Sequence, residues 1–257
     1  MQQSRGITDQ STLIEQLQNQ IRRAETTRRV DDGTCISSGC EAINRMLPAG
    51  GYLPGAIIQW LTHGGQGVDF LSLLAAKNAC EQGGALVVFD PHNRFYPPAA
   101  AAIGINLGNL IILRADEASN SNHSPHDSQS NLLWAIDQAL RCPAVAAVWG
   151  AIDSIGEKWF RRFQLSAETS GCLGLFIQPL RQSRQPSWAE VQWTVGPSSK
   201  QNRPQASSSS PEHSLQAGRE LRLSLKLTRC RNTHTGKSIV LSINTITGNV
   251  RQLRFGS

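Results

Sequence analysis

The stretch Gly55-Ala-Ile-Ile-Gln-Trp-Leu61, followed by Thr62-His-Gly-Gly-Gln-Gly-Val-Asp69, decides the fold. It predicts an apolar strand, a glycine-rich loop and a helix that opens near Val68. This is the context in which the phosphate-binding P-loop, G-x-x-x-x-G-K-[ST], occurs. In this chain Thr62 stands at the first glycine of that motif, Val68 at the lysine and Asp69 at the hydroxyl residue. The pattern indicates the scaffold of a nucleotide site without the side chains that hold a nucleotide.

The loop glycines remain, but the charges that a P-loop needs do not. Gly64, Gly65 and Gly67 retain a loop whose backbone N–H groups can face an anion. A P-loop lysine and Mg²⁺ neutralise the phosphates, whereas a carboxylate about 4 Å from a phosphate oxygen costs roughly 1–4 kcal/mol. Lys77 begins roughly 13 Å along the helix and is too far away to replace the missing cation. We therefore expect no tight ATP binding and no ATPase activity, and Asp69 also has a structural interpretation as an acid that complements the helix dipole.

Length and composition restrict the class of protein. The 257 residues suit one α/β domain, with or without a small appendage. No apolar run approaches the roughly 18 residues needed to cross a bilayer, and the first residues do not resemble a signal peptide. We therefore expect a cytoplasmic protein with no membrane partner. The six cysteines form no C-x-x-C pair and are interpreted as reduced apolar side chains. We expect no metal site, including at His123 and His126 in a polar loop.

Five apolar segments alternate with helical patterns through most of the chain. The predicted strands are continuously apolar, as is typical when helices cover both faces of a sheet. The order predicts an α/β fold with a doubly wound, mostly parallel sheet. The predicted strands are 55–61, 84–90, 110–113, 144–149 and 173–178. The predicted helices are 68–81, 97–103, 129–141 and 156–170.

The ends of the chain differ from this core. Residues 1–32 predict an amphipathic N-terminal helix, and residues 33–196 the core, in which Ser38-Gly-Cys-Glu41 reads as a capping box. Residues 197–218, rich in Ser, Pro and Gln, predict a flexible linker. In 219–257 leucines alternate with polar residues, which predicts antiparallel strands that complete the edge of the core sheet.

Positive charge gathers in that last segment. The formal net charge is +6, and residues 219–257 carry eight Lys/Arg against one acid. Such a field favours an anionic partner, nucleic acid first, although a solvated basic face is an alternative. Aromatic Trp159 and Phe163 accompany further cations, a combination that suits single-stranded DNA, or else simple packing. The candidate DNA or partner contacts are Lys158, Arg161, Arg162, Arg181, Arg184, Arg222, Lys226 and Arg229.

Several strings, in their order, resemble known proteins. Ile36–Asn44 and Gly50–Gly55 resemble the beginning of the RecA recombinase core. The chain more specifically resembles the ImuA family of RecA-like accessory proteins in bacterial SOS mutagenesis, over about residues 34–255. The strings that carry this second resemblance are Leu133–Val148, Arg161–Glu168, Arg184–Glu190 and Leu223–Arg231.

The resemblance implies a RecA-like fold, related also to SulA, and a role in SOS-induced error-prone translesion DNA synthesis. It implies two protein partners, an ImuB-like Y-family protein and an error-prone C-family polymerase. RecA and DNA are further candidate partners, and the location would be the cytoplasm, at the nucleoid. Two alternatives stay open: an ATP-binding, RecA-type recombinase-like enzyme, and a cell-division inhibitor of the SulA type.

The resemblance also identifies the positions of the other functional residues of a nucleotide site. The aspartate that positions Mg²⁺ in RecA-like enzymes is replaced by Trp149-Gly150, and Asp153 comes about three residues late. Asp90 is present at the end of its strand, but His92 stands where the catalytic glutamate would be. Gln178 resembles the polar sensor of the active members. These replacements imply a pseudo-ATPase with no cofactor, although His92 could serve as a base if a triphosphate were bound.

Overall fold

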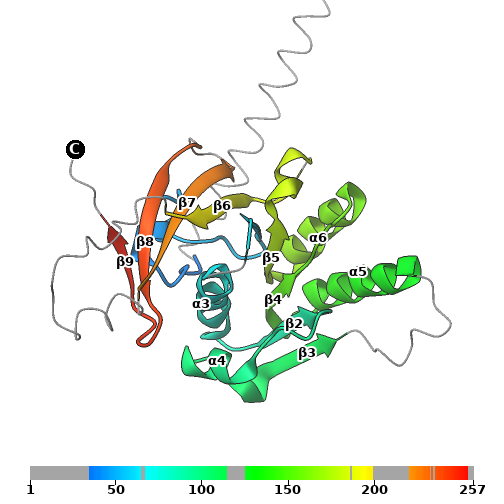
Figure 1. Cartoon of the computed structure of the whole chain (residues 1–257). Helices are drawn as coiled ribbons and strands as arrows, with labels where there is room; N and C mark the ends of the chain where they lie inside the picture. The colour runs from blue at the N-terminus through cyan, green and yellow to red at the C-terminus, as the bar shows by residue number, and fades with distance from the viewer. Residues whose placement is uncertain are drawn as a thin grey trace, which may run out of the picture.

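The computed structural model describes residues 35–64, 67–114, 125–185, 187–198, 220–231, 233 and 235–253. The strands assigned in this part of the chain are β1 Ile57–Thr62, β2 Ala85–Asp90, β3 Leu110–Arg114, β4 Val145–Ala151, β5 Leu173–Pro179, β6 Val191–Pro197, β7 Glu220–Cys230, β8 Ser238–Asn244 and β9 Val250–Leu253. They form one sheet in the order β3-β2-β4-β5-β1-β6-β7-β8-β9 (Figure 1). In this order, adjacent strands from β3 to β6 run parallel to each other. The pairs β6–β7, β7–β8 and β8–β9 are antiparallel. The predicted α/β fold, mostly parallel with antiparallel C-terminal strands, is confirmed.

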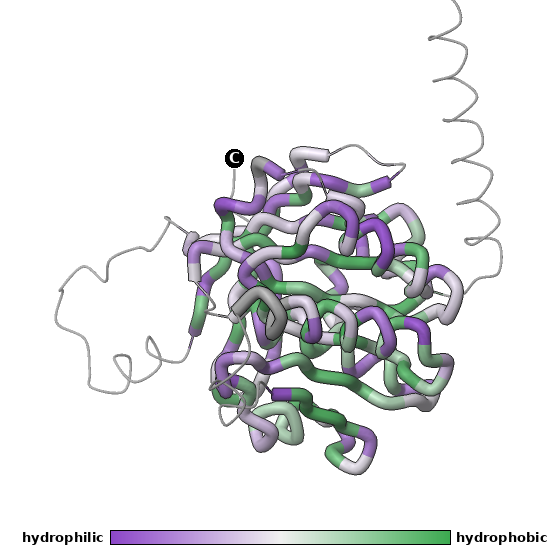
Figure 2. Tube along the Cα trace, turned by 90° about the vertical axis from the view of Figure 1, so that its right-hand side faces the viewer, coloured by the Kyte–Doolittle hydropathy of each residue, from purple (hydrophilic) through white to green (hydrophobic). Residues whose placement is uncertain are grey.

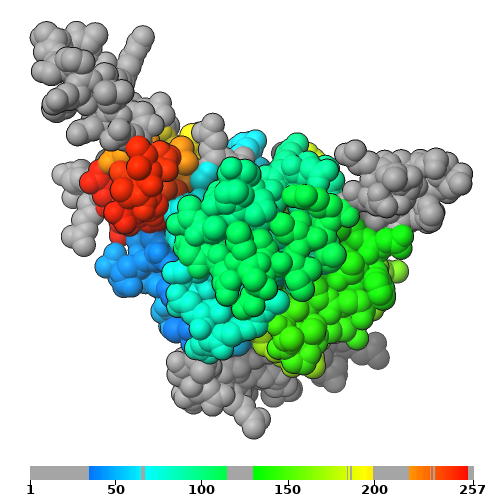
Figure 3. All heavy atoms as spheres, turned by 90° about the horizontal axis from the view of Figure 1, so that it is seen from below, coloured from blue at the N-terminus to red at the C-terminus, as the bar shows by residue number. Residues whose placement is uncertain are grey.

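Helices cover both faces of the parallel part of the sheet. Their bounds are α2 Glu41–Asn44, α3 Val68–Cys80, α4 Pro97–Ala102, α5 Pro125–Arg141 and α6 Glu157–Ser170, with 3-10 turns η1 Leu107–Asn109 and η3 Leu180–Arg184. One core lies on the side of α2, α3 and α4, and a second lies under α5 and α6 (Figure 1). β3 and β9 are the two end strands of the sheet. Seen from below, the green segment that includes β3 faces the viewer, and the C-terminal strands, in red, lie to its left (Figure 3).

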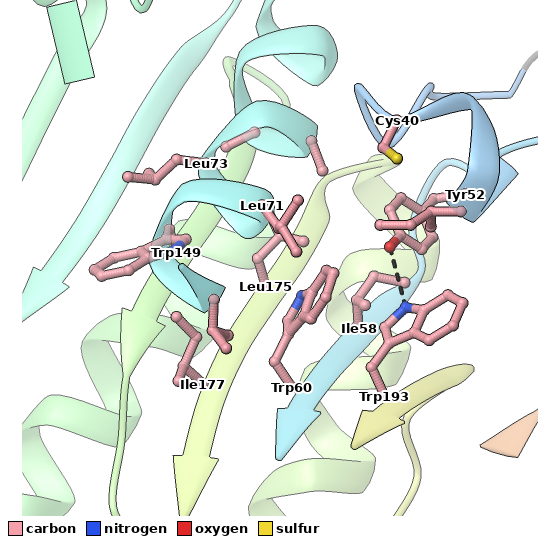
Figure 4. Close-up of a cluster of buried hydrophobic side chains, with 14 of the residues drawn as sticks. Cys40, Tyr52, Ile58, Trp60, Leu71, Leu73, Trp149, Leu175, Ile177 and Trp193 are labelled. Atoms are coloured by element: carbon pink, nitrogen blue, oxygen red, sulfur yellow. Dashed lines mark hydrogen bonds between the residues drawn. The ribbon is translucent and has the colours of Figure 1, made fainter. Parts of the chain in front are cut away.

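Aromatic residues fill the core on the α3 side. Trp60 and Trp193 come from adjacent strands and stack with ring centroids 6.0 Å apart. The Trp193 indole N–H donates to the Tyr52 hydroxyl at 3.1 Å, below Leu71 of α3 (Figure 4). Burial raises the pKa of Tyr52 far above its usual range, so this hydroxyl stays neutral. The cluster ties β1, β6 and the segment before β1 into one unit.

The second core joins α6 to the sheet. Phe163 of α6 is fully buried and lies against Phe176 of β5, with ring centroids 5.7 Å apart. Figure 2 views the molecule from this side and shows hydrophobic residues concentrated along the strands. Of the two interpretations of Trp159 and Phe163, simple packing therefore holds for Phe163, because its ring is buried and cannot stack on a base.

Three local predictions were wrong in detail. The N-cap of α2 is Cys40, without a side-chain cap, because the Ser38 hydroxyl instead donates to Asn44 Oδ1 at 2.7 Å. α5 starts at Pro125 rather than at 129, since proline needs no N–H partner in a first helical turn. β4 continues to Ala151, two residues beyond its predicted end.

Several predictions concern segments outside the described residues. The helix predicted in 1–32, the loop with His123, and the linker 197–218 beyond Ser198 belong to them. Among the helices that are described, none is long and apolar enough to span a membrane.

Candidate functional site

Parallel strands end together at one edge of the sheet, and a pocket of about 590 Å³ lies there. In open α/β sheets ligands bind outside the carboxyl ends of the strands. The pocket takes its lining from the loops after β1, β2, β4 and β5 and from the start of α3. It brings together nine of the residues singled out from the sequence: Thr62, Gly64, Asp69, Asp90, His92, Trp149, Asp153, Gln178 and Arg181.

The residue at the lysine position of the P-loop points away from this pocket. Val68 is fully buried among the hydrophobic residues on the α3 side of the sheet. Gly67 precedes it with a φ of +80°, and a Cβ there would lie 2.6 Å from Leu221 Cδ2 and 2.8 Å from Leu223 Cδ1. The loop is therefore fitted against β7, and this packing explains a glycine at Gly67 without any phosphate.

The loop after β1 closes on itself. The Thr62 hydroxyl donates to the Gly64 carbonyl at 2.7 Å and accepts from the Gly64 N–H at 3.1 Å. That N–H is one of the groups that a P-loop would turn toward a phosphate. Here it is already paired. Gly65 lies outside the described residues.

Asp69 places a carboxyl group in the first turn of α3, at the wall of the pocket. Burial raises the pKa of Asp69, and the charge of nearby Arg94 lowers it. Its position in the first turn fits the helix-dipole interpretation. When ionised, it opposes an anion in the pocket.

Asp90 holds the chain after β2. It is 4% exposed, and its two carboxylate oxygens accept the backbone N–H groups of Arg94 at 2.7 Å and Phe95 at 2.9 Å. Arg114 Nε lies 3.7 Å away. A carboxylate with these partners is fully committed to the fold, so its presence here does not require a bound magnesium ion.

The remaining polar residues of the pocket form an exposed group at its mouth. His92 Nε2 lies 3.6 Å from Asp153 Oδ2, and Arg181 Nη2 lies 4.0 Å from Asp153 Oδ1. Asp153 stands two residues after β4, closer to the strand end than expected, because β4 is longer than predicted. Trp149 is 5% exposed and donates from Nε1 to the Ser72 hydroxyl of α3 at 2.8 Å. It fills space between β4 and α3.

A chain of buried amides crosses the sheet beside the pocket, and sequence reasoning missed it. Gln59 of β1 donates to Gln178 and accepts from Ser187 at 2.8 Å and from Gln192 at 2.7 Å. Gln192 in turn accepts from Thr228 at 3.0 Å. The signal was available, since glutamine interrupts three apolar strands. Gln178, expected to resemble a sensor, is bound to its neighbour strand.

The predicted basic residues of α6 do lie together. Lys158, Arg161 and Arg162 line a groove of about 530 Å³ between α5 and α6, with Arg141 of α5. Arg161 lies over the Trp188 ring at 5.0 Å and Arg162 over the Trp159 ring at 5.2 Å. These contacts fix two guanidinium groups at the molecular surface.

Several of the C-terminal cations have intramolecular partners, which the sequence did not lead us to expect. Arg222 Nη2 lies 3.9 Å from Glu220, which Arg251 also contacts. Arg229 has an intramolecular partner as well, whereas Lys226 is exposed. The side chain of Arg184 lies outside the described residues. DNA binding through this strand stays a prediction.

In the described part of the chain, no group of three or more His, Cys, Asp or Glu residues is placed to hold a metal ion. All six cysteines are free, and burial raises the pKa of the Cys80 thiol to about 11 and that of Cys230 to about 12. These thiols are protonated at neutral pH and unreactive.

Comparison with known proteins points to RecA. No protein-family model matches the chain. RecA of Francisella philomiragia is 31% identical over 110 residues, which cover 41% of this chain and 31% of that RecA. RecA of Francisella tularensis subsp. novicida matches with the same identity and coverage. The chain thus spans about a third of the length of the curated relatives it matches. Together with the sheet topology, this similarity makes the fold RecA-like, while membership of the ImuA family stays a prediction.

Proposed function

We propose that this protein is a non-catalytic, RecA-like accessory protein in SOS-induced, error-prone translesion DNA synthesis and repair. The burial of Val68 carries the non-catalytic part of the proposal. A P-loop enzyme needs a cation at that position, aimed at the β- and γ-phosphates. In this fold the position faces the core on the α3 side.

The charges of the pocket support the same conclusion. Three carboxylates (Asp69, Asp90 and Asp153) and two guanidinium groups (Arg94 and Arg181) contribute to its lining, a formal sum of −1 with both histidines neutral. Each guanidinium group has a carboxylate partner: Asp153 for Arg181, and Asp69, through its charge, for Arg94. A triphosphate in this pocket would therefore meet no guanidinium group whose charge is not already balanced by a carboxylate.

The partners in the proposal come from the resemblance to the ImuA family. They are an ImuB-like Y-family protein and an error-prone C-family polymerase, with RecA and DNA as further candidates. The protein would act in the cytoplasm, at the nucleoid. The similarity to RecA over two fifths of the chain is consistent with a role in DNA repair.

Nucleotide binding can be tested by thermal unfolding. A ligand at 100 times its dissociation constant stabilises a protein by about 2.7 kcal/mol, which corresponds to several degrees in melting temperature. We expect no shift with millimolar Mg-ATP or Mg-ADP, under conditions in which a RecA control shifts. A saturable rise of several degrees would exclude the pseudo-ATPase and favour the recombinase-like enzyme.

The partners can be tested separately by affinity capture. The tagged full chain, expressed in its native host, is recovered from DNA-damaged and undamaged cells. We expect a Y-family-like protein and a C-family polymerase to be enriched after damage. Recovery of the cell-division GTPase in their place would support the SulA-type alternative and contradict the proposal.

A further inference from the structure

The groove between α5 and α6 lies on the opposite face of the sheet from α3, away from the nucleotide loop (Figure 1). Four cations line it, together with Leu165 and Thr169: Arg141, Lys158, Arg161 and Arg162. We propose that this groove binds the phosphate backbone of single-stranded DNA, and that buried Asp137 positions its arginines. The proposal rests on the proposed function only in the choice of DNA as the anion.

Asp137 is the organising residue beneath the groove. It occupies the apolar face of α5, at helical spacing from Leu133, Ile136 and Leu140, and is fully buried. Its Oδ2 accepts from Arg162 Nη2 at 2.8 Å and lies 3.0 Å from Arg141 Nε. Its Oδ1 accepts from the Ser166 hydroxyl at 2.7 Å. One carboxylate therefore holds one arginine from each helix.

These arginines remain available to a ligand. The side chains of Arg141 and Arg162 are 53% and 44% exposed. A guanidinium group has five N–H donors, of which Asp137 occupies a minority. The remaining donors are held near the surface by a partner that solvent cannot reach. Their geometry is set before a ligand arrives, which reduces the entropy lost on binding.

The charge of the groove favours an anion. Four cations contribute to its lining, and Asp137 is the acid that Arg141 and Arg162 contact, which leaves a formal sum of +3. Lys158 forms no ion pair with any residue that the structure describes. The arrangement suits successive phosphate groups along a strand.

An exposed aromatic ring favours a nucleic acid over other polyanions. Trp134 is 56% exposed and precedes Arg141 by seven residues, so both lie on one stripe of α5, about 10 Å apart along its axis. Exposed aromatic rings beside a basic groove are the usual platform on which single-stranded bases stack. Leu165 of α6 is 57% exposed and adds apolar surface at the opposite wall.

Fluorescence anisotropy of a labelled oligothymidylate of about 20 nucleotides tests the groove. The full chain is compared with Lys158→Gln/Arg161→Gln and with a control of equal charge, Arg45→Gln/Lys77→Gln. Arg45 is exposed, the Lys77 side chain is 33% exposed, and both lie outside the groove and outside the basic segment 219–257. We expect the groove variant to bind at least tenfold more weakly and to lower the slope of log K against log salt by about 1.4, or about 0.7 per lost phosphate contact. The control should stay within twofold of the wild type. Equal losses in both variants would overturn the proposal, because they would show a general electrostatic field.

Two further variants separate positioning and stacking from charge. Asp137→Asn adds a positive charge to the groove, so charge alone predicts tighter binding, whereas loss of positioning predicts weaker binding. We expect weaker binding in a variant that remains folded by circular dichroism, and tighter binding would overturn the role of Asp137.

Trp134→Ala should weaken the binding of oligothymidylate about fivefold or more and leave the binding of inorganic polyphosphate unaffected. Equal effects on both probes, or none on either, would overturn the choice of single-stranded DNA. Partner capture is measured on the unchanged chain, so failure of DNA binding here would leave that test of the proposed function intact.

Discussion

The carboxyl-edge pocket and the α5–α6 groove use the same kinds of charged side chain in opposite arrangements. In the pocket, Asp69 and Asp153 stand at the walls and face the cations there. In the groove, Asp137 lies beneath the cations and is out of contact with solvent. In the pocket, the carboxylates neutralise the cations at the place where a ligand would enter. In the groove, the buried carboxylate orients the cations toward solvent.

The comparison teaches that an inherited scaffold does not fix the place of binding. The pocket keeps the strand, the glycine loop and the helix of a phosphate site, yet its formal charge is −1. The groove has no recognisable motif in the sequence, yet its formal charge is +3. For an anionic ligand, charge at the point of contact outweighs the shape of the backbone.

The largest effect that can break this comparison concerns stability. Asp137→Ala should lower the free energy of unfolding by about 3 kcal/mol, since it leaves Ser166 and two arginines without their buried partner. The matched change in the pocket, Asp153→Ala, should cost less than about 0.5 kcal/mol, because that carboxylate is 68% exposed. Urea denaturation of both variants measures the difference. Similar costs would mean that the two acids do not play opposite structural roles.

A pair of loop glycines sharpens the comparison from the side of the pocket. Gly67→Ala should cost about 2 kcal/mol, from a left-handed backbone and from contact of the new methyl group with Leu221 and Leu223. Gly64→Ala meets nothing within 4 Å and should stay within about 0.5 kcal/mol of the wild type. Denaturant midpoints of the two variants provide the measurement. Equal sensitivity would indicate that the loop is constrained by something other than β7.

The smallest effect concerns the pH dependence of stability. Burial raises the pKa of Asp69 in the folded protein, against the opposing charge of Arg94. The folded state therefore keeps this proton to a higher pH than the unfolded state does, and stability falls as pH rises from the unfolded pKa through the folded one. Asp69→Asn should match the wild type near pH 3, below the unfolded pKa of about 3.9, and be slightly more stable at pH 7. Melting curves across this range would contradict us if the wild type were the more stable at neutral pH.

Periodicity and order were sufficient to predict most of the fold. The apolar runs located β1, β2, β4 and β5, because strands covered on both faces carry a strong signal. The leucines of β7 predicted a strand with one buried face, and Leu223, Leu225 and Leu227 are indeed buried. The ends of helices and strands were predicted less accurately. A residue such as Ser38, which the sequence places as a helix cap, can form a different hydrogen bond in the folded chain.

The sites were only partly predictable. The pattern around Val68 indicated that the lysine of a P-loop is replaced, but not that the side chain in its place would be part of the core. Asp137 stands on an apolar helical face, which is a signal that went unused, yet its arginine partner on α6 comes from a distant part of the chain. Pairings of this kind depend on how the helices pack, and no short pattern contains that information.

The contact of Gly67 with Leu221 and Leu223 joins the start of α3 to the C-terminal strands without an intervening side chain. We expect a displacement of β7 to be transmitted to Gly67 and the start of α3, because the two pack directly against each other. This coupling joins residues that are more than 150 positions apart in the chain.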